Sequence, residues 1–197
     1  MNKVIRTIIK KVKSWNGLTI AAVALFSLIF IFSIYRHFKG SRTHIDMVVG
    51  EHIQLLQKAL NKVDKDCHIV DFEHEKNYID FLNVVSFVGS EVGAVNLLYP
   101  DSWKGPYLRD NFTMQEQQYQ VLANNQGHFI VPGPGVRLGN GKVIGKDIIL
   151  TYDTDLQTLL KDKNGLMSHD DRALAVPIKI SGSRIERLLQ RVVSPNH

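Results

Sequence analysis

Residues 67–75 read CHIVDFEHE and carry side chains of the kinds that bind metal ions: Cys67, His68, Asp71, Glu73, His74 and Glu75. A zinc site usually draws its ligands from two spaced pairs of such residues. No second pair stands out elsewhere in the sequence, so we expect a solvated, charged loop here rather than a zinc site. Cys67 is the only cysteine, which excludes an internal disulfide even in an oxidising compartment.

Two other segments have residue types that suit a ligand. In YDTDLQ, residues 152–157, Asp153 and Asp155 have the alternate spacing with which a loop can hold calcium. We expect no bound cofactor, and calcium at Asp153 and Asp155 is the alternative. In PGPGVRLGNGK, residues 132–142, the glycines follow a predicted strand, as in a phosphate-binding loop. The G-x-x-x-x-G-K-[ST] spacing is missing, however, and a strand is predicted to follow. We expect a turn-rich loop there.

The sequence offers no recognisable catalytic nucleophile. The G-x-S-x-G elbow of many hydrolases is absent, and the scattered serines and histidines do not identify a triad. We therefore expect that the protein is not an enzyme. A membrane-anchored hydrolase is a further function class, but the sequence shows no catalytic site that would support it.

The segment YPDSWKGPYLRD, residues 99–110, combines stiff, permissive and aromatic residues without any reactive array. Pro106 restricts the backbone, Gly105 allows a turn that other residues resist, and Trp103 and Tyr107 supply apolar area with a polar tip. Such a segment can cover the end of a sheet or meet another subunit. We interpret it as structural.

The positive charge of the chain is concentrated at its N-terminus. Eight of the 24 Lys and Arg residues lie in residues 1–42, which contain no acid, so the remaining residues are net negative. A nucleic-acid-binding domain would need a basic face on the folded body, so nucleic acid is not an expected partner.

Residues 18–35, LTIAAVALFSLIFIFSIY, form an uncharged run close to the length that crosses a bilayer. The run is longer than the apolar core of a secretory signal and is followed by no small-residue cleavage site.

This run predicts a retained, single-pass membrane anchor. Five Lys or Arg precede it, and three follow it closely. The positive-inside bias therefore predicts a cytoplasmic N-terminus, with everything after Lys39 across the membrane.

Past the membrane the helical pattern continues. Apolar residues recur at three- and four-residue steps and form one stripe: Ile45, Val48, Val49, Ile53, Leu56, Ala59, Leu60 and Val63. Gly40 and Gly50 weaken the helix without ending it. We expect one long helix, half in lipid, whose outer half lays this stripe against a globular head. The domains expected are a leader (1–17), a transmembrane helix (18–38), its extramembrane half (39–66) and a head (67–197).

The head is predicted to be α+β. Residues 75–89 suit a short helix, and residues 181–193 suit a Ser-capped amphipathic helix built on Ile185, Leu188, Leu189 and Val192. Asn140-Gly141 predicts a tight turn, and Pro177 argues that its strand is an edge strand. The predicted strands are YQVL (119–122), HFIV (128–131), KVIG (142–145), DIILTY (147–152) and ALAVPIKI (173–180).

This layout resembles a type IV pilin or a type II secretion pseudopilin, in which a long, half-membranous N-terminal helix packs on a small antiparallel sheet. NGLTI, residues 16–20, is similar to the prepilin processing site, which a specialised peptidase cuts after a glycine. The resemblance places that cut between Gly17 and Leu18. WKGPY, which includes Trp103, Gly105, Pro106 and Tyr107, is similar to a segment that many major pseudopilins carry before their sheet.

The resemblance implies a structural subunit of a type II secretion or type IV pilus system. Its expected partners are other pilin-like subunits, membrane lipid and the prepilin peptidase. Some pseudopilins bind calcium in a late loop, but the glycine-rich C-terminus of that family is missing here. Most members also have a Glu at the fifth residue after the cut, where this chain has Ala22. A buried carboxylate at that depth is costly unless paired. The alternative is an anchored envelope binding protein whose pilin-like head is not assembled into a fibre.

Overall fold

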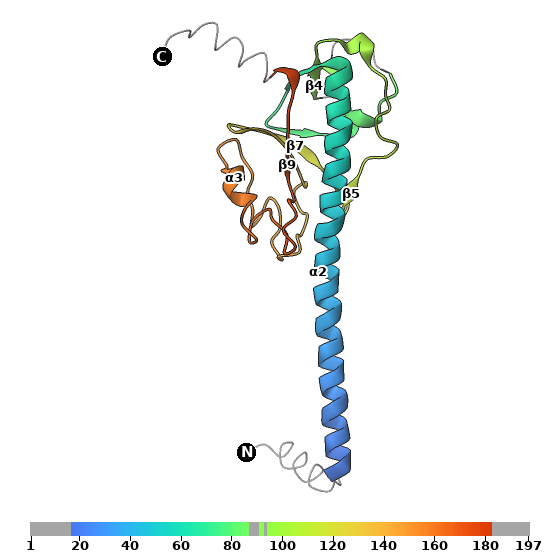
Figure 1. Cartoon of the computed structure of the whole chain (residues 1–197), viewed down its shortest axis with the longest axis vertical. Helices are drawn as coiled ribbons and strands as arrows, with labels where there is room; N and C mark the ends of the chain where they lie inside the picture. Colours follow the sequence, from blue (N-terminus) through green and yellow to red (C-terminus); the bar gives the residue numbers. More distant parts are fainter. Residues whose placement is uncertain (1–16, 87–90, 93, 183–197) are drawn as a thin grey trace, which may run out of the picture. The chain divides into compact units, whose positions relative to one another are not determined.

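A long helix, α2, occupies Gly17–Cys67 and leads into short strands and loops (Figure 1). The structure, a computed structural model, describes residues 17–86, 91–92 and 94–182. The chain divides into two compact units, Met1–Ser41 and Arg42–His197. The fold is mixed α+β, with an apolar N-terminal helix and small antiparallel sheets, as the sequence predicted at this level.

In the first unit, α2 is apolar and its described side chains are exposed. Thr19–Arg36 is long and apolar enough to cross a membrane, and it is the one such helix among the described residues. Leu25, Phe26 and Phe30 are each more than half exposed. In water such a surface would be costly, so it is compatible with a single-pass membrane helix. A signal sequence would meet the same criterion of length and composition.

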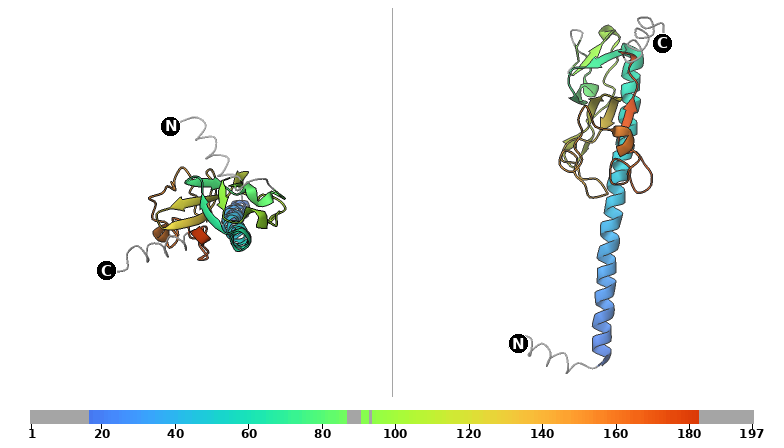
Figure 2. Two further views of the ribbon diagram at one scale, coloured as in Figure 1. Left: turned by 90° about the horizontal axis from the view of Figure 1, so that it is seen from above. Right: turned by 90° about the vertical axis from the view of Figure 1, so that its left-hand side faces the viewer.

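In the second unit, the outer part of α2 supplies one wall of the hydrophobic core. Val49, Ile53, Leu56, Leu60 and Val63 are at most 1% exposed. These are five of the eight residues of the predicted stripe. Ala59 is buried as well, whereas Ile45 and Val48 are half-buried, so the stripe is confirmed as a buried face from Val49 onward. The helix ends at Cys67, which is also buried. Two views at right angles show the described strands and loops after Cys67 gathered beside this part of α2 (Figure 2).

Within the part of the chain that the structure describes, the strands form three small antiparallel sheets. Their orders are β1-β4-β3, β2-β7-β8-β9 and β5-β6. The bounds are β1 Ile69–Phe72, β2 Lys76–Tyr78, β3 Glu91–Val92, β4 Val95–Leu97, β5 Thr113–Met114, β6 Gln117–Gln118, β7 Gln120–Asn124, β8 Gly127–Val131 and β9 Val176–Ile178. Three short helical turns complete the described elements: η1 Asp80–Asn83, η2 Pro100–Ser102 and α3 Leu156–Leu159.

The four-stranded sheet contains the predicted strands near residues 119–122 and 128–131 as β7 and β8. Val121 pairs with Ile130, and both are fully buried. Of the run 173–180, only Val176–Ile178 is a strand, and this strand, β9, lies at the edge of the sheet as Pro177 predicted. The side chain of Gln57 on α2 donates a hydrogen bond to the carbonyl of Pro177 at 2.8 Å. This bond ties the edge strand to the helix.

Three predicted elements, one helix and two strands, were wrong. Residues 75–89 were predicted to be one helix, but they contain strand β2 and the turn η1 instead. Lys76, Asn77 and Tyr78 pair with Leu122, Val121 and Gln120, so strand pairing overrides the local apolar periodicity. Residues 142–145 and 147–152 were predicted to be strands but form isolated bridges, Arg137 with Val143 and Ile144 with Ile148. Gly145, at φ +81°, turns the chain between them.

The predicted turn at Asn140-Gly141 is present. Gly141 has φ +88°, and the amide of Leu138 donates to the carbonyl of Lys142 at 2.9 Å. The side chain of Asn140 accepts from the amide of Lys142 at 3.0 Å. The predicted helix over residues 181–193 lies almost wholly outside the described residues.

Candidate functional site

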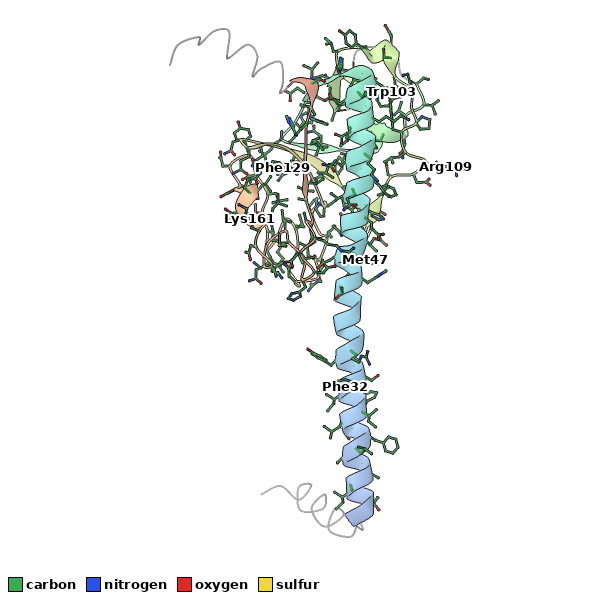
Figure 3. The ribbon with its side chains drawn as sticks, in the orientation of Figure 1. Phe32, Met47, Trp103, Arg109, Phe129 and Lys161 are labelled. Atoms are coloured by element: carbon green, nitrogen blue, oxygen red, sulfur yellow. The ribbon has the colours of Figure 1, made fainter. Side chains whose placement is uncertain are left out.

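The segment that we interpreted as structural, Trp103–Tyr107, lies against the Cys67 end of α2 (Figure 3). The indole N–H of Trp103 donates to the carbonyl of Val84 at 2.9 Å. The rings of Trp103 and Tyr107 meet edge to face, with centroids 4.8 Å apart. We call Trp103, Gly105, Pro106 and Tyr107 the clasp, because they join the segment after η1 to the helix.

Tyr107 makes the contact with the helix. Its hydroxyl donates to Oδ2 of Asp66 at 3.1 Å and accepts from the amide of Lys104 at 3.3 Å. The ammonium of Lys104 lies 3.4 Å from Oδ1 of the same carboxylate. Burial raises the pKa of Tyr107, so the phenol stays protonated and remains a donor to Asp66 at physiological pH.

Gly105 permits the close approach on which the clasp depends. A Cβ at this position would lie 2.1 Å from the carbonyl oxygen of Val84 and 2.2 Å from the indole nitrogen of Trp103. The Gly105-Pro106 peptide bond is cis. Beyond it, the amides of Tyr107 and Leu108 both donate to the carbonyl of Leu82, at 2.8 and 3.1 Å. These contacts suit a packing role and bring no reactive group to the surface.

The potential metal ligands of residues 67–75 are not gathered into a site. Ile69–Phe72 form strand β1 rather than the loop that we expected, whereas Glu73, His74 and Glu75 are exposed. Cys67 is buried, and burial raises the pKa of its thiol. Within the described ranges, no group of three or more His, Cys, Asp or Glu side chains could hold a metal ion.

A serine, a histidine and an aspartate do meet where β1 begins, a cluster that the sequence analysis missed because Asp64 and Ser181 are far apart in the chain. The hydroxyl of Ser181 donates to Oδ2 of Asp64 at 3.1 Å and lies 3.2 Å from Nδ1 of His68. The amides of Ile69 and Ser181 both donate to Oδ1 of Asp64, at 2.9 and 2.8 Å.

This arrangement does not match a catalytic triad. In a triad the imidazole bridges serine and carboxylate through its two different nitrogens. Here the serine hydroxyl bonds directly to the carboxylate, and His68 uses Nδ1 for both Ser181 and the carbonyl of Asp64. The cluster instead anchors β1 and the segment at Ser181 to the end of α2.

The two calcium candidates have different surroundings. Asp155 caps helix α3: Oδ2 accepts from the hydroxyl of Thr158 at 2.6 Å, and Oδ1 accepts from its amide at 3.2 Å and from the side chain of Gln126 at 2.9 Å. The hydroxyl of Thr158, then Gln126, lowers the pKa of Asp155 to about 2. Asp153 is exposed, and the described residues give its side chain no hydrogen bond. Both carboxylate oxygens of Asp155 therefore already accept hydrogen bonds that stabilise the fold.

Hydrogen bonds from the side-chain amide of Asn124 stabilise the loop that contains Asp153 and Asp155. The side-chain nitrogen of Asn124 donates toward three carbonyls, those of Thr151, Tyr152 and Thr154, at 2.7 to 3.2 Å. An open cleft of about 410 Å³ lies beside α3, and Asp147, Asp155 and Asp162 line it. Asp147 accepts from the amide of Val143, and Asp162 accepts from the amide of Asn164. All three carboxylates thus stabilise turns.

Gly17 and Leu18, the residues of the proposed processing site, are the first two residues of α2. The leader before Gly17 lies outside the described residues. Ala22 follows within the exposed, apolar part of the helix. Compared with protein-family models, with curated proteins and with solved structures, the chain gives no significant match.

Proposed function

We propose that this protein is a pilin-like, pseudopilin-like structural subunit of a type II secretion or type IV pilus system. The observation that carries the proposal is helix α2. It is apolar and exposed over Thr19–Arg36, and its Val49–Val63 stripe is buried in the core of an α+β unit. In the proposed arrangement the apolar part anchors the protein in the inner membrane, and the head lies in the periplasm.

Two local features support this function over an enzymatic one. The clasp is packed for structure, with its aromatic rings and donors satisfied within the head. The Ser181–His68–Asp64 cluster lacks the relay geometry of a hydrolase. Both features suit a protein that works by presenting surfaces to other subunits rather than by chemistry.

Ala22 favours a second candidate, an anchored envelope binding protein with a pilin-like head. A carboxylate at this position would give an assembled subunit a charged partner for a neighbour's new N-terminal amine, and alanine cannot do so. The same residue also suits a tip or accessory subunit, which would lack one of the usual fibre contacts.

The N-terminal residue of the mature protein separates the two candidates. If prepilin peptidase recognises residues 16–20, the intact mass of protein extracted from membranes corresponds to a chain that starts at Leu18. Gly17→Val should leave the full-length chain, because a branched side chain does not fit where the peptidase accepts glycine. Thr19→Ser is the matched control and should be processed normally. A wild-type mass that includes residues 1–17 would contradict the subunit proposal and favour the anchored binder.

A further inference from the structure

Among the described residues, nothing pairs with the side-chain amide of Gln120 on β7. The residue is only 6% exposed, so its amide has given up most of its contact with water. Leaving a buried amide without a hydrogen-bond partner costs free energy, and native folds contain few such groups. Each one therefore needs an explanation, and the surroundings of Gln120 supply it.

Gln120 lines a pocket of about 80 Å³ on one face of the four-stranded sheet. It pairs with Val131 of β8 in a regular antiparallel register, and paired residues present their side chains on the same face. Leu122, two residues along β7, shares this face, and so does its partner on β2, Lys76. Of the described residues that line the pocket, Lys76 and Gln120 alone have polar side chains. The remaining walls are apolar.

One of these walls is the proline-rich segment that follows β8. Pro132 and Pro134 line the pocket, and because proline has no amide hydrogen, they offer Gln120 no donor. The segment lies tightly against the neighbouring strand: a Cβ at Gly133 would lie 2.0 Å from the carbonyl oxygen of Gln118. The wall is thus fixed in place, and the pocket is formed before any ligand binds.

The size and the rim of the pocket indicate what fits. Sites for drug-sized ligands have volumes of ~300–1,000 Å³, whereas about 80 Å³ admits one short side chain. A carboxamide both donates and accepts, and so does the peptide group of an extended chain. Beside the pocket, Tyr78 is the register partner of Gln120 and is 51% exposed. Exposed tyrosines of this kind are enriched where proteins bind one another.

We propose that this pocket binds an extended segment of a partner protein, which inserts one short aliphatic side chain, such as that of valine. An adjacent peptide group of the segment pairs with the amide of Gln120, and the flanking residues lie on Tyr78. The side chain of Lys76 is 44% exposed, so its ammonium favours a segment with an acidic residue beside the inserted one. The inference holds for either of the two proposed functions, because it does not depend on processing at Gly17.

The test titrates the full-length chain in lipid nanodiscs with N-acetyl-valinamide and N-acetyl-glycinamide. Both probes have the same peptide groups, and only the first has a side chain that can enter the pocket. NMR of protein with isotope-labelled glutamine side chains follows Gln120, whose signals are those missing from Gln120→Leu. The valine probe should shift these signals and bind about tenfold or more tightly than the glycine probe, because burial of its side chain contributes that factor. Equal binding of the two probes, or no shift at Gln120, would show that the pocket holds only water and would overturn the proposal.

Isobutyrate distinguishes a peptide segment from a small carboxylate as the occupant. It has the branched aliphatic group of valine but a carboxylate in place of the peptide groups. Weaker binding of isobutyrate than of N-acetyl-valinamide is the expected result. Tighter binding would assign the pocket to small carboxylates, held by Lys76, and would contradict the proposal.

The variant Gln120→Leu separates a binding role from a structural one. It should bind the valine probe about tenfold or more weakly, yet melt at or above the wild-type temperature, because leucine removes an unpaired buried amide without leaving a gap. Gln57→Leu makes the same change at a residue that does not line the pocket, and it should bind the probe like the wild type. A melting temperature of Gln120→Leu several degrees below the wild type would show that the amide stabilises the fold, and the binding role would be wrong.

Discussion

The structure leaves no room for a side chain at Gly105 but has room for a methyl group at Gly50. The clasp closes only because Gly105 has no side chain, since Val84 and Trp103 occupy the space where a Cβ would lie. Gly50 lies within α2, where a Cβ would find its nearest atoms 3.9 and 4.0 Å away, an ordinary contact distance. The same substitution therefore has a different physical effect at each position.

We expect Gly105→Ala to destabilise the head by about 1–3 kcal/mol, the usual cost of overpacking. It should also weaken the bond from Trp103 to Val84. Gly50→Ala should instead stabilise it, by up to about 1 kcal/mol, because alanine is the better helix former. Thermal unfolding of the full-length protein in detergent measures both changes. Equal melting temperatures for the two variants would show that the clasp is not closed as described.

Asp155 should make the stability of the head depend on pH in the acid range. Hydrogen bonds from Thr158 and Gln126 lower its pKa from 3.8 to about 2. A carboxyl whose pKa is lower in the folded than in the unfolded state stabilises the fold above the unfolded value, and this contribution is lost as the pH falls through the folded value. Asp155→Ala should therefore melt below the wild type near neutral pH, and the gap should close as the pH falls from 3.8 towards 2.

Asp153→Ala is the matched control for this acid effect, since its carboxylate is exposed and makes no hydrogen bond among the described residues. Its melting temperature should follow the wild type at every pH. A gap for Asp155→Ala that stays constant with pH would indicate that the ionised carboxylate does not cap α3.

At the scale of elements, the outer half of α2 packs into the core of the head through one of its faces. Leu56 is fully buried, and its neighbour Leu55 is 45% exposed. Leu56→Ala and Leu60→Ala should each cost about 2–5 kcal/mol of unfolding free energy. Leu55→Ala, an identical change on the open face, and Lys58→Ala should stay within about 0.5 kcal/mol. Denaturant unfolding of the full-length chain distinguishes these outcomes. If all four variants unfolded alike, the stripe would not pack into the core.

Elements whose pattern is local were predicted well. The α2 stripe, β7, β8 and the edge position of β9 all follow from periodicity or from the missing amide of Pro177. The helix predicted over residues 75–89 was wrong because Asn77, a buried polar residue, lies in β2 and pairs with β7. The side chain of Asn77 makes its hydrogen bonds with the backbone of His74. Such non-local pairing is not encoded in a short window. Helix α3 was missed, although Asp155 before an apolar run is an N-cap signal.

The candidate sites were harder to predict than the elements. The clasp residues were identified, but their partners Val84, Leu82 and Asp66 were not, because these lie far away in sequence. The Asp64–Ser181 contact joins residues 117 positions apart. Only the fold brings such residues together.

At the scale of the whole molecule, the asymmetry of charge predicts topology. The residues before the apolar run carry five bases and no acid. The positive-inside bias therefore favours a cytoplasmic N-terminus and a head across the membrane. A reporter that works only in the cytoplasm should be silent when fused after His197 and active when fused before Met1. Strong activity of the C-terminal fusion would reverse the orientation and remove the basis of the proposed function.

The contacts of Asn140 bear on how the protein ages chemically. An asparagine followed by glycine is especially prone to spontaneous deamidation, because the unhindered glycine nitrogen attacks the side-chain amide. In the fold, that amide donates to the carbonyls of Lys163 and Gly165 at 3.2 and 3.1 Å, and the nitrogen of Gly141 is held on the carbonyl of Leu138 at 2.9 Å. Both reactants are engaged, so damage at residue 140 should accumulate mainly while the head is unfolded. The deamidated fraction of an old sample would then record how long its molecules had spent out of the native state.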